Sequence, residues 1–248
     1  MAKAQHLTAS ATEVLVRENE EVHFRESTLA RVSYYLLKLI LGPIVRWLWI
    51  HSVEGLEHIP KKGPIIVVAN HSSYLDFICF VAVSPRRIHY LAAEKFYKSV
   101  VWKPLMVATS QIYIDRKAKD KTHVHKKVES ALRQGRMVGI FPEGTRSADG
   151  EIQRPYTGVA RYAMKHKVPV LPVGICNTYE VLSRYDKFPK LKKIVKICIS
   201  PPMYFTEYYN RHHDESFFEH LTHTIMEEIS RLSGLVYRHR KNKWKEEN

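Results

Sequence analysis

The sequence has few cysteines and no feature that directs secretion. Cys79, Cys176 and Cys198 are far apart in apolar surroundings, and none has the close spacing of a metal-binding or redox motif. We therefore expect buried thiols in a reducing compartment. The histidine pairs lack an accompanying set of ligands, so we expect no metal centre. The first 25 residues are polar and lack the apolar core and cleavage site of a signal peptide.

Acidic residues are also scarce. The 248 residues include 39 Lys and Arg against 25 Asp and Glu, a net charge of +14. Such an excess favours a polyanionic partner, which could be nucleic acid, an anionic membrane or a phosphorylated substrate. Because no recognisable RNA- or DNA-binding motif is present, we expect no nucleic-acid partner. Hydrophobic residues make up 45% of the chain, enough for one sizeable catalytic domain.

A long apolar run free of charges is missing as well. Residues 29–50 are rich in Leu, Ile, Tyr and Trp, but Arg31, Lys38 and Arg46 interrupt them. On a helix these cations fall within about 80° of one another and form a basic stripe beside a broad apolar face. Because Gly42-Pro43 should break the segment, we predict two short amphipathic helices in the membrane interface, with the stripe on anionic lipid. The aromatic residues expected at headgroup depth are Tyr34, Tyr35, Trp47 and Trp49. The alternative is a helical hairpin packed on the protein's own core.

From residue 58 onwards, short apolar runs alternate with helical patterns and polar loops, as in an α/β domain. Helices are predicted over 119–134, before Gly135, and from Asp214 as N-cap to Gly234. The predicted class is therefore α/β, with a mixed, central β-sheet flanked by helices. The predicted strands are 65–69, 88–91, 111–115, 137–141, 168–175 and 194–200.

A histidine and an aspartate follow the first predicted strand, in the polar turn 70–76. Histidine can accept a proton near neutral pH, and a neighbouring carboxylate can fix its tautomer. On a straight helix His71 and Asp76 would point about 140° apart. The pair therefore requires His71 in a loop and Asp76 in the first turn of the next helix, with Ser72 or Ser73 as N-cap. An ordinary capped strand-to-helix turn would show the same pattern.

A second polar loop, 141–147, follows the predicted strand 137–141. Gly144 lets the backbone approach a ligand, Thr145 offers a hydroxyl, and Arg146 supplies a planar guanidinium suited to phosphate. Glu143 could hold that guanidinium or a substrate hydroxyl. The alternative is a Pro-Gly turn with a surface ion pair.

Together the two loops resemble motifs of the glycerolipid acyltransferase family, typified by lysophosphatidic acid acyltransferases. The family's His-x4-Asp motif is matched at 70–76, its Glu-Gly-Thr-Arg motif at 143–146, a middle motif ending Ile-Asp-Arg at 112–116, and a proline-punctuated strand at 168–174. All four stand in the family's order. Ser110 replaces a usual glycine of the family, and Tyr156-Thr157 precede Gly158 where Lys or Arg is common.

The resemblance implies transfer of a fatty acyl group from a thioester, acyl-CoA or acyl carrier protein, to the free hydroxyl of a lysophospholipid. The expected acceptor is 1-acyl-sn-glycerol-3-phosphate and the product phosphatidic acid, with no cofactor. His71 would be the general base and Asp76 its orienting partner, while Arg146 and Arg116 anchor the phosphate. The other residues expected to bind substrate are Glu143, Gly144 and Thr145.

The family's resemblance also implies an N-terminal pair of amphipathic helices, in agreement with residues 29–50. We expect a membrane-associated segment at 1–52 with a polar lead, the acyltransferase domain at 53–234 and a basic tail at 235–248, attached as a monotopic or peripheral protein to the cytoplasmic face of a membrane. One alternative is a different acceptor, another lysophospholipid or a lyso-aminolipid. Another is a non-catalytic basic module that binds a membrane surface or nucleic acid.

Overall fold

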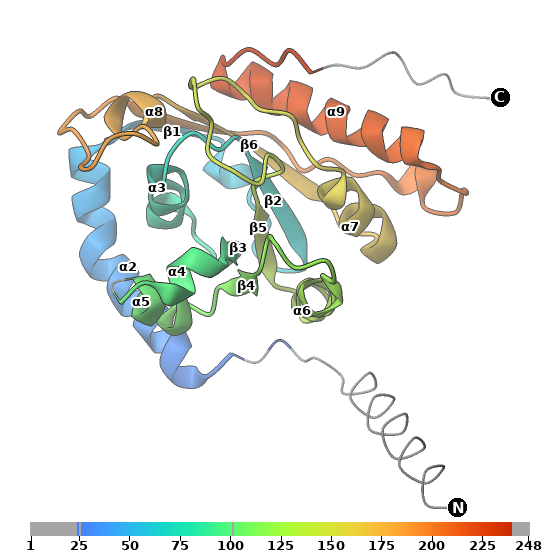
Figure 1. Ribbon diagram of the computed structural model, residues 1–248, viewed down its shortest axis with the longest axis horizontal. Helices are drawn as coiled ribbons and strands as arrows, with labels where there is room; N and C mark the ends of the chain where they lie inside the picture. The colour runs from blue at the N-terminus through green and yellow to red at the C-terminus, as the bar shows by residue number, and fades with distance from the viewer. Residues whose placement is uncertain (1–23, 25, 101, 240–248) are drawn as a thin grey trace, which may run out of the picture.

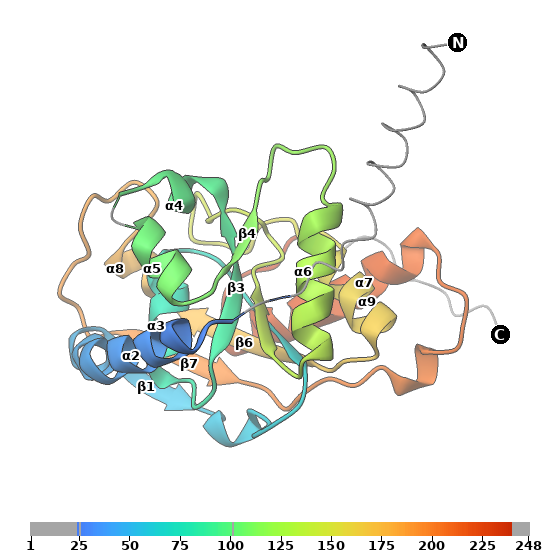
Figure 2. The same ribbon diagram turned by 90° about the horizontal axis from the view of Figure 1, so that it is seen from below.

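A seven-stranded sheet lies between two layers of helices in the computed structural model, which describes residues 24, 26–100 and 102–239 (Figures 1 and 2). The strand order is β1-β7-β6-β2-β5-β3-β4. Neighbouring strands are parallel except for β6 and β7, which are antiparallel. The predicted mixed α/β class, with helices flanking a central sheet, is confirmed.

The strands are β1 (Ile50–Glu54), β2 (Ile65–Ala69), β3 (Ile88–Ala93), β4 (Ile112–Ile114), β5 (Met137–Ile140), β6 (Val170–Cys176) and β7 (Val195–Ile199). The helices are α2 (Thr28–Leu48), α3 (Leu75–Val83), α4 (Glu94–Lys98), α5 (Trp102–Ala108), α6 (Thr122–Arg133), α7 (Gly158–His166), α8 (Thr178–Val181) and α9 (Glu215–Ser233), with short 3-10 turns η1 (Leu56–His58) and η2 (Thr206–Tyr208). All six predicted strands and both predicted helices are present.

Strand β2 shows how the sheet divides the core into two layers. Ile66 and Val68 pack with residues of α6, α7 and α9, whereas Ile65, Val67 and Ala69 pack with residues of α2 and α3. All five side chains are buried, because successive residues of a strand point to opposite faces and both faces are covered. The carboxyl end of β2, where residue 70 begins the polar turn, is therefore held from both sides.

The N-terminal apolar segment forms one helix, so the prediction of two helices broken at Gly42-Pro43 is wrong. Helix α2 continues through Pro43 to Leu48. A proline inside a helix removes the bond that its own N–H would make, and packing of α2 against α3 offsets this loss. Gly42 is buried at this contact, and a Cβ added there would lie at an ordinary van der Waals distance, 3.7 Å, from the carbonyl oxygen of Ala82 in α3.

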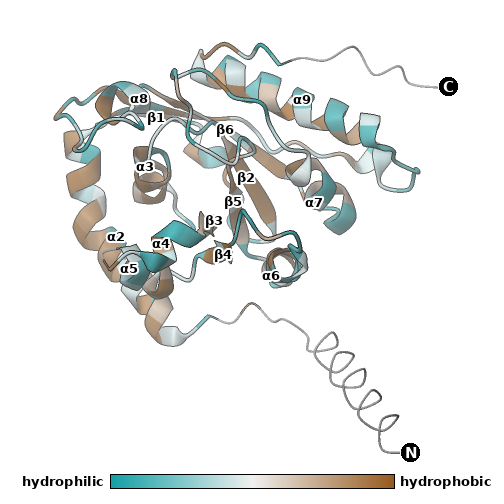
Figure 3. Ribbon diagram, in the orientation of Figure 1, coloured by the Kyte–Doolittle hydropathy of each residue, from teal (hydrophilic) through white to brown (hydrophobic). Residues whose placement is uncertain are grey.

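The predicted basic stripe of α2 does not face outwards as a unit. Lys38 turns towards the domain, where its ammonium donates to the carbonyl of Ser84. Of the aromatic residues expected at headgroup depth, Tyr34 is buried and the Trp49 indole donates to a carbonyl of the domain. Arg31 and Arg46 are exposed, but most of the outer surface of α2 is apolar (Figure 3). Its exposed large side chains are Leu29, Val32, Tyr35, Leu36, Leu39, Ile40, Leu41, Ile44 and Trp47.

Strand β1 was not predicted. It is a five-residue edge strand that follows α2 after one residue and pairs with β7, and Ile50 is its one buried residue. In a short, half-exposed strand directly after an apolar helix, the alternation of apolar and polar residues is too brief to identify the strand from the sequence. It spans the predicted domain boundary at residue 52. Residues 1–23 of the predicted polar lead and 240–248 of the predicted basic tail lie outside the described residues.

Gly139 offers a test of the packing beneath the site. In β5 it pairs with Tyr90 of β3, and a Cβ added to Gly139 would lie 2.4 Å from Cε1 of the Tyr90 ring. We expect Gly139→Ala to lower the free energy of unfolding by about 1–3 kcal/mol, the usual cost of overpacking a core. Gly158→Ala is the matched control, since nothing lies within 4 Å of the added carbon. Equal urea midpoints for the two variants would contradict this account.

Candidate active site

The turn between β2 and α3 brings His71 and Asp76 into contact, as their spacing predicts. Nδ1 of His71 lies 2.9 Å from Oδ2 of Asp76. Asp76 is in the first turn of α3 and its side chain is fully buried, whereas the imidazole is 14% exposed. The pair therefore has a buried carboxylate and an imidazole at the rim.

Backbone and hydroxyl donors surround the Asp76 carboxylate. Its Oδ2 accepts from the backbone N–H groups of Ser72 and Ser73, both at 2.8 Å, and its Oδ1 accepts from the Thr178 hydroxyl. The predicted N-cap, Ser72 or Ser73, is wrong by one or two positions: the N-cap residue of α3 is Tyr74, although the Ser73 hydroxyl accepts from the N–H of Leu75 at 3.1 Å. A carboxylate that only accepts hydrogen bonds requires the proton on Nδ1 of His71, which leaves the lone pair of Nε2 free.

Hydrogen bonds join the His71 turn to its neighbours. The side-chain amide of Asn70 both donates to and accepts from the backbone of Ile175 in β6, at 2.8 Å each. The N–H of Ser147 donates to the carbonyl of His71 at 2.7 Å. Turns 70–76 and 141–147 therefore form one site at the carboxyl ends of the parallel strands β2 and β5, where α/β folds place their ligands.

Glu143 has a different contact from the predicted one. Its carboxylate is buried and accepts from the backbone N–H groups of His71, at 2.6 Å, and Gln153, at 2.7 Å. The expectation that it holds the Arg146 guanidinium is wrong, because the carboxylate is used to connect two loops. Burial raises the pKa of Glu143 to about 8, although the two backbone donors oppose this shift.

The two predicted phosphate ligands lie on either side of the 143–146 turn. The Arg146 guanidinium stacks over the ring of Tyr74, 3.7 Å from its centroid. Nη1 of Arg116 donates to the carbonyl of Gly144 at 3.1 Å, and its Nε lies 3.8 Å from Glu94. Gly144 has a φ of 66°, a left-handed conformation that favours glycine. Thr145 is exposed beside them.

Tyr74, which the sequence reasoning did not assign to the site, lies under the guanidinium of Arg146. A ring under a guanidinium holds the planar group in one orientation and leaves its N–H groups free for an anion. The pattern offers one signal: Tyr74 belongs to the same six-residue motif as His71 and Asp76. Among the residues that the structure describes, no cluster of three or more His, Cys, Asp or Glu could hold a metal ion.

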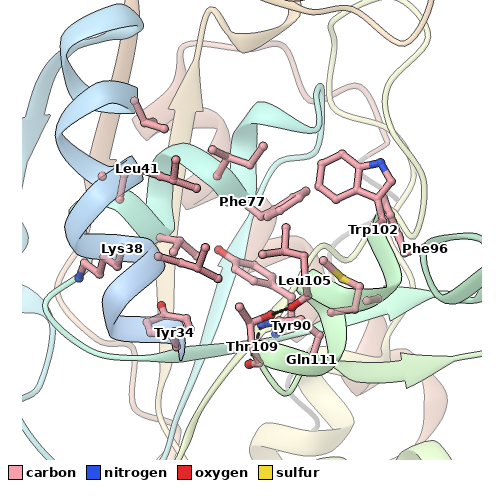
Figure 4. A pocket seen from close by; sticks show the side chains of 18 of the residues that line it. Tyr34, Lys38, Leu41, Phe77, Tyr90, Phe96, Trp102, Leu105, Thr109 and Gln111 are labelled. Atoms are coloured by element: carbon pink, nitrogen blue, oxygen red, sulfur yellow. Dashed lines mark hydrogen bonds between the residues drawn. The ribbon is translucent and has the colours of Figure 1, made fainter. Parts of the chain in front are cut away.

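A stack of rings leads from His71 into the protein. Phe141 lies parallel to the imidazole, with centroids 4.1 Å apart, and Tyr90 lies parallel to Phe141 at 5.3 Å. Phe141 and Tyr90 both line an apolar cavity of about 340 Å³ between α2, α3, α5 and β3 (Figure 4). The cavity therefore reaches to within one ring of the catalytic candidate His71.

The lining of this cavity comes from segments far apart in the chain. Other side chains that Figure 4 labels are Tyr34, Lys38, Leu41, Phe77, Phe96, Trp102, Leu105, Thr109 and Gln111. In the sequence each of them reads as ordinary core or helix surface, because an apolar residue facing a cavity has the same pattern as one facing a neighbour. Sequence reasoning missed the cavity for this reason.

Comparison with known proteins identifies similar chains. The family model described as Acyltransferase matches residues 51–176. The 1-acyl-sn-glycerol-3-phosphate acyltransferase of Saccharomyces cerevisiae is 32% identical over 181 residues, covering 71% of this chain and 57% of the yeast protein. The enzyme of the same name from Borreliella burgdorferi is 28% identical over 136 residues, and the match covers 53% of this chain and 54% of the Borreliella protein. The chain thus spans little more than half the length of these curated relatives.

A solved structure is similar over nearly the whole chain. It is the crystal structure of the 1-acyl-sn-glycerophosphate (LPA) acyltransferase PlsC from Thermotoga maritima. The TM-score is 0.65 at 25% sequence identity, and the match covers 94% of this chain and 90% of that one. The likeness therefore includes the helices around the sheet as well as the motif-bearing turns.

The buried Glu143 carboxyl predicts a pH dependence of stability. Its pKa is raised from 4.5 to about 8 in the folded protein, so the folded state keeps a proton that the unfolded chain releases in this range. The associated stabilisation is complete below the lower value and is lost as the pH rises through the higher one. The slope is at most about 1.4 kcal/mol per pH unit.

Urea unfolding of Glu143→Gln across this pH range should show a flatter profile than the wild type, because the titrating group is gone. Glu57→Gln, which changes an exposed glutamate in η1, should leave the slope unchanged. Parallel profiles for wild type and Glu143→Gln would contradict the assignment.

Proposed function

The chain belongs to the Acyltransferase family, and we propose that it transfers a fatty acyl group from an acyl thioester to the free hydroxyl of 1-acyl-sn-glycerol-3-phosphate, giving phosphatidic acid. The observation that carries this proposal is the hydrogen bond from His71 to the buried Asp76. The names of the yeast and spirochaete relatives support the choice of acceptor. The thioester is acyl-CoA or acyl carrier protein, and no cofactor takes part.

His71 acts as the general base in the proposed reaction. Its Nε2 takes the proton of the acceptor hydroxyl while the oxygen attacks the thioester carbonyl. Asp76 stabilises the imidazolium that forms and keeps the ring in place. When the tetrahedral intermediate collapses, the carbon–sulfur bond breaks and the leaving thiolate takes the proton from His71. The ester, the free thiol and a neutral imidazole result, without an acyl-enzyme.

Arg146 and Arg116 anchor the acceptor's phosphate in this proposal. Both lie at the 143–146 turn, and their N–H groups can form paired, charge-assisted bonds with phosphate oxygens. The exposed Thr145 hydroxyl and the backbone at Gly144 provide further contacts. Glu143 contributes indirectly, since its carboxylate holds the backbone of His71 and of Gln153. The phosphate is thereby positioned so that the acceptor hydroxyl meets His71.

The apolar cavity holds an acyl chain of the substrates. Its volume of about 340 Å³ is in the range of ligand pockets, and its wall includes Phe141, which stacks on His71. A chain that enters beside Phe141 would leave its carbonyl end near the base. Burial of that chain among apolar side chains stabilises binding by about 0.8 kcal/mol per methylene.

Helix α2 attaches the enzyme to a membrane as a monotopic protein on the cytoplasmic face. By length and composition it is the one helix of the described residues that could cross a membrane. Its inner side, including Tyr34 and Val45, packs on the domain, so lipid cannot surround it. Its outer side is apolar, which suits a helix lying in the interface.

Replacing His71 tests the base. We expect His71→Ala to lower kcat for thioester-dependent acylation of lysophosphatidic acid by about 10²–10⁴, the usual contribution of a general base. His123→Ala, at an exposed histidine of α6, should behave as wild type. His123→Ala should unfold at the wild-type urea concentration, whereas His71→Ala removes one donor to the buried Asp76 and should unfold at a lower one. Retention of kcat within tenfold in His71→Ala would end the proposed mechanism.

Replacing Arg146 tests the phosphate anchor. Arg146→Ala should raise KM for lysophosphatidic acid by about 10–100-fold, because a charge-assisted bond contributes about 1.5–3 kcal/mol. A 1-acylglycerol without phosphate should be acylated equally by the variant and the wild type. Arg133→Ala, at an exposed position of α6, is the charge-matched control. An equal loss of activity on both acceptors would show that Arg146 does not bind the phosphate.

A further inference from the structure

Cations and exposed apolar side chains alternate in residues 183–193, the basic loop between α8 and β7. It contains five Lys and Arg against one acid, Asp186. Tyr185, Phe188 and Leu191 are 73%, 73% and 78% exposed. Three large apolar side chains so close together and so exposed are unusual for a solvated loop, where isolated ones are normal.

The basic loop lies beside the end of α2. The Trp49 indole, at the C-cap of α2, donates to the carbonyl of Lys190 at 3.0 Å. Figures 1 and 2 both show this loop, in orange, on the side of the molecule that α2 covers. The C-terminal end of α2 and the basic loop are therefore in direct contact.

We propose that the basic loop is a second lipid-contact surface, which lies on anionic headgroups while Tyr185, Phe188 and Leu191 enter the interface. Two observations favour a membrane as the occupant. The loop lies beside the end of α2, whose outer side chains are also exposed and apolar. Its own cations alternate with aromatic rings: the Lys187 ammonium is 5.7 Å from the Phe188 ring and the Arg184 guanidinium 5.7 Å from the Tyr185 ring. Amphipathic rings and basic groups are what a headgroup layer stabilises.

The basic loop also contacts the candidate active site. Nη1 of Arg184 donates to the backbone carbonyl of Arg146 at 3.4 Å. A loop held at headgroup depth would therefore place the phosphate anchor at the same depth, where the phosphate of a membrane-bound acceptor lies. This link to the acceptor rests on the proposed function, but lipid contact by the loop does not.

Vesicle sedimentation of the full chain, without substrate, tests the proposal. One variant carries Lys187→Gln, Lys192→Gln and Lys193→Gln. Its partition onto phosphatidylcholine vesicles that contain phosphatidylglycerol should fall by about tenfold to a hundredfold, since each lysine near an anionic surface contributes about fivefold. Partition onto pure phosphatidylcholine vesicles should hardly change. A second variant, Phe188→Ser with Leu191→Ser, should lower partition onto both kinds of vesicle, because it removes apolar area.

The charge-matched control carries Lys61→Gln, Lys62→Gln and Lys119→Gln, three exposed lysines outside the loop and α2. Equal loss of binding in the control and the loop variant would overturn the proposal, because net charge alone would explain it. The proposal would also be overturned if the loop variant sedimented with vesicles as the wild type does but no longer bound a purified acyl carrier protein. The loop would then bind an acidic protein partner and not lipid. If the wild type transfers no acyl group but the loop variants still lose vesicle binding, the lipid contact stands and the proposed function fails.

Discussion

The arrangement of the site depends on the buried carboxylate of Asp76. A charged group without solvent is stable only where donors surround it, and here they come from His71, Thr178 and the backbone of Ser72 and Ser73. Satisfying that one group fixes the turn, the start of α3 and the orientation of the imidazole together. A catalytic base that must stay in one tautomer is thereby held by the same bonds that stabilise the fold.

The second turn is fixed by the first. Ser147 donates to the carbonyl of His71, Glu143 accepts from its N–H, and Arg146 lies on the ring of Tyr74. Each contact joins residues about 70 positions apart in the sequence. Each also involves a polar group that would be hydrated in a solvent-exposed loop. Burying the Glu143 carboxyl disfavours its charged form, and this raises its pKa to about 8. These contacts join the two turns into a single site.

The same fold places the site next to an apolar surface. β2 buries both of its faces, α3 starts at the catalytic turn, and α2 packs on α3. The inner side of α2 lines the apolar cavity, and its C-terminal end contacts the basic loop. In the proposed reaction, whose acceptor has a charged headgroup and an apolar chain, this arrangement brings the proposed phosphate anchor, the cavity and the proposed lipid-contact surface into one region. Ser110, where the family resemblance leads one to expect glycine, has a φ of 51°, a left-handed conformation that favours glycine.

The sequence by itself determined the α/β class, six of the strands, both predicted helices and the two polar turns, because these depend on periodicity and on local turn chemistry. Tertiary structure alone decided the rest. It kept α2 continuous through Pro43, since packing against α3 outweighs one lost hydrogen bond. It turned Lys38 inwards and moved Glu143 from the phosphate anchor to the loop junction. These outcomes depend on which groups lie across the sheet or beneath a helix. The sequence alone does not give the distances between residues that are far apart in the chain.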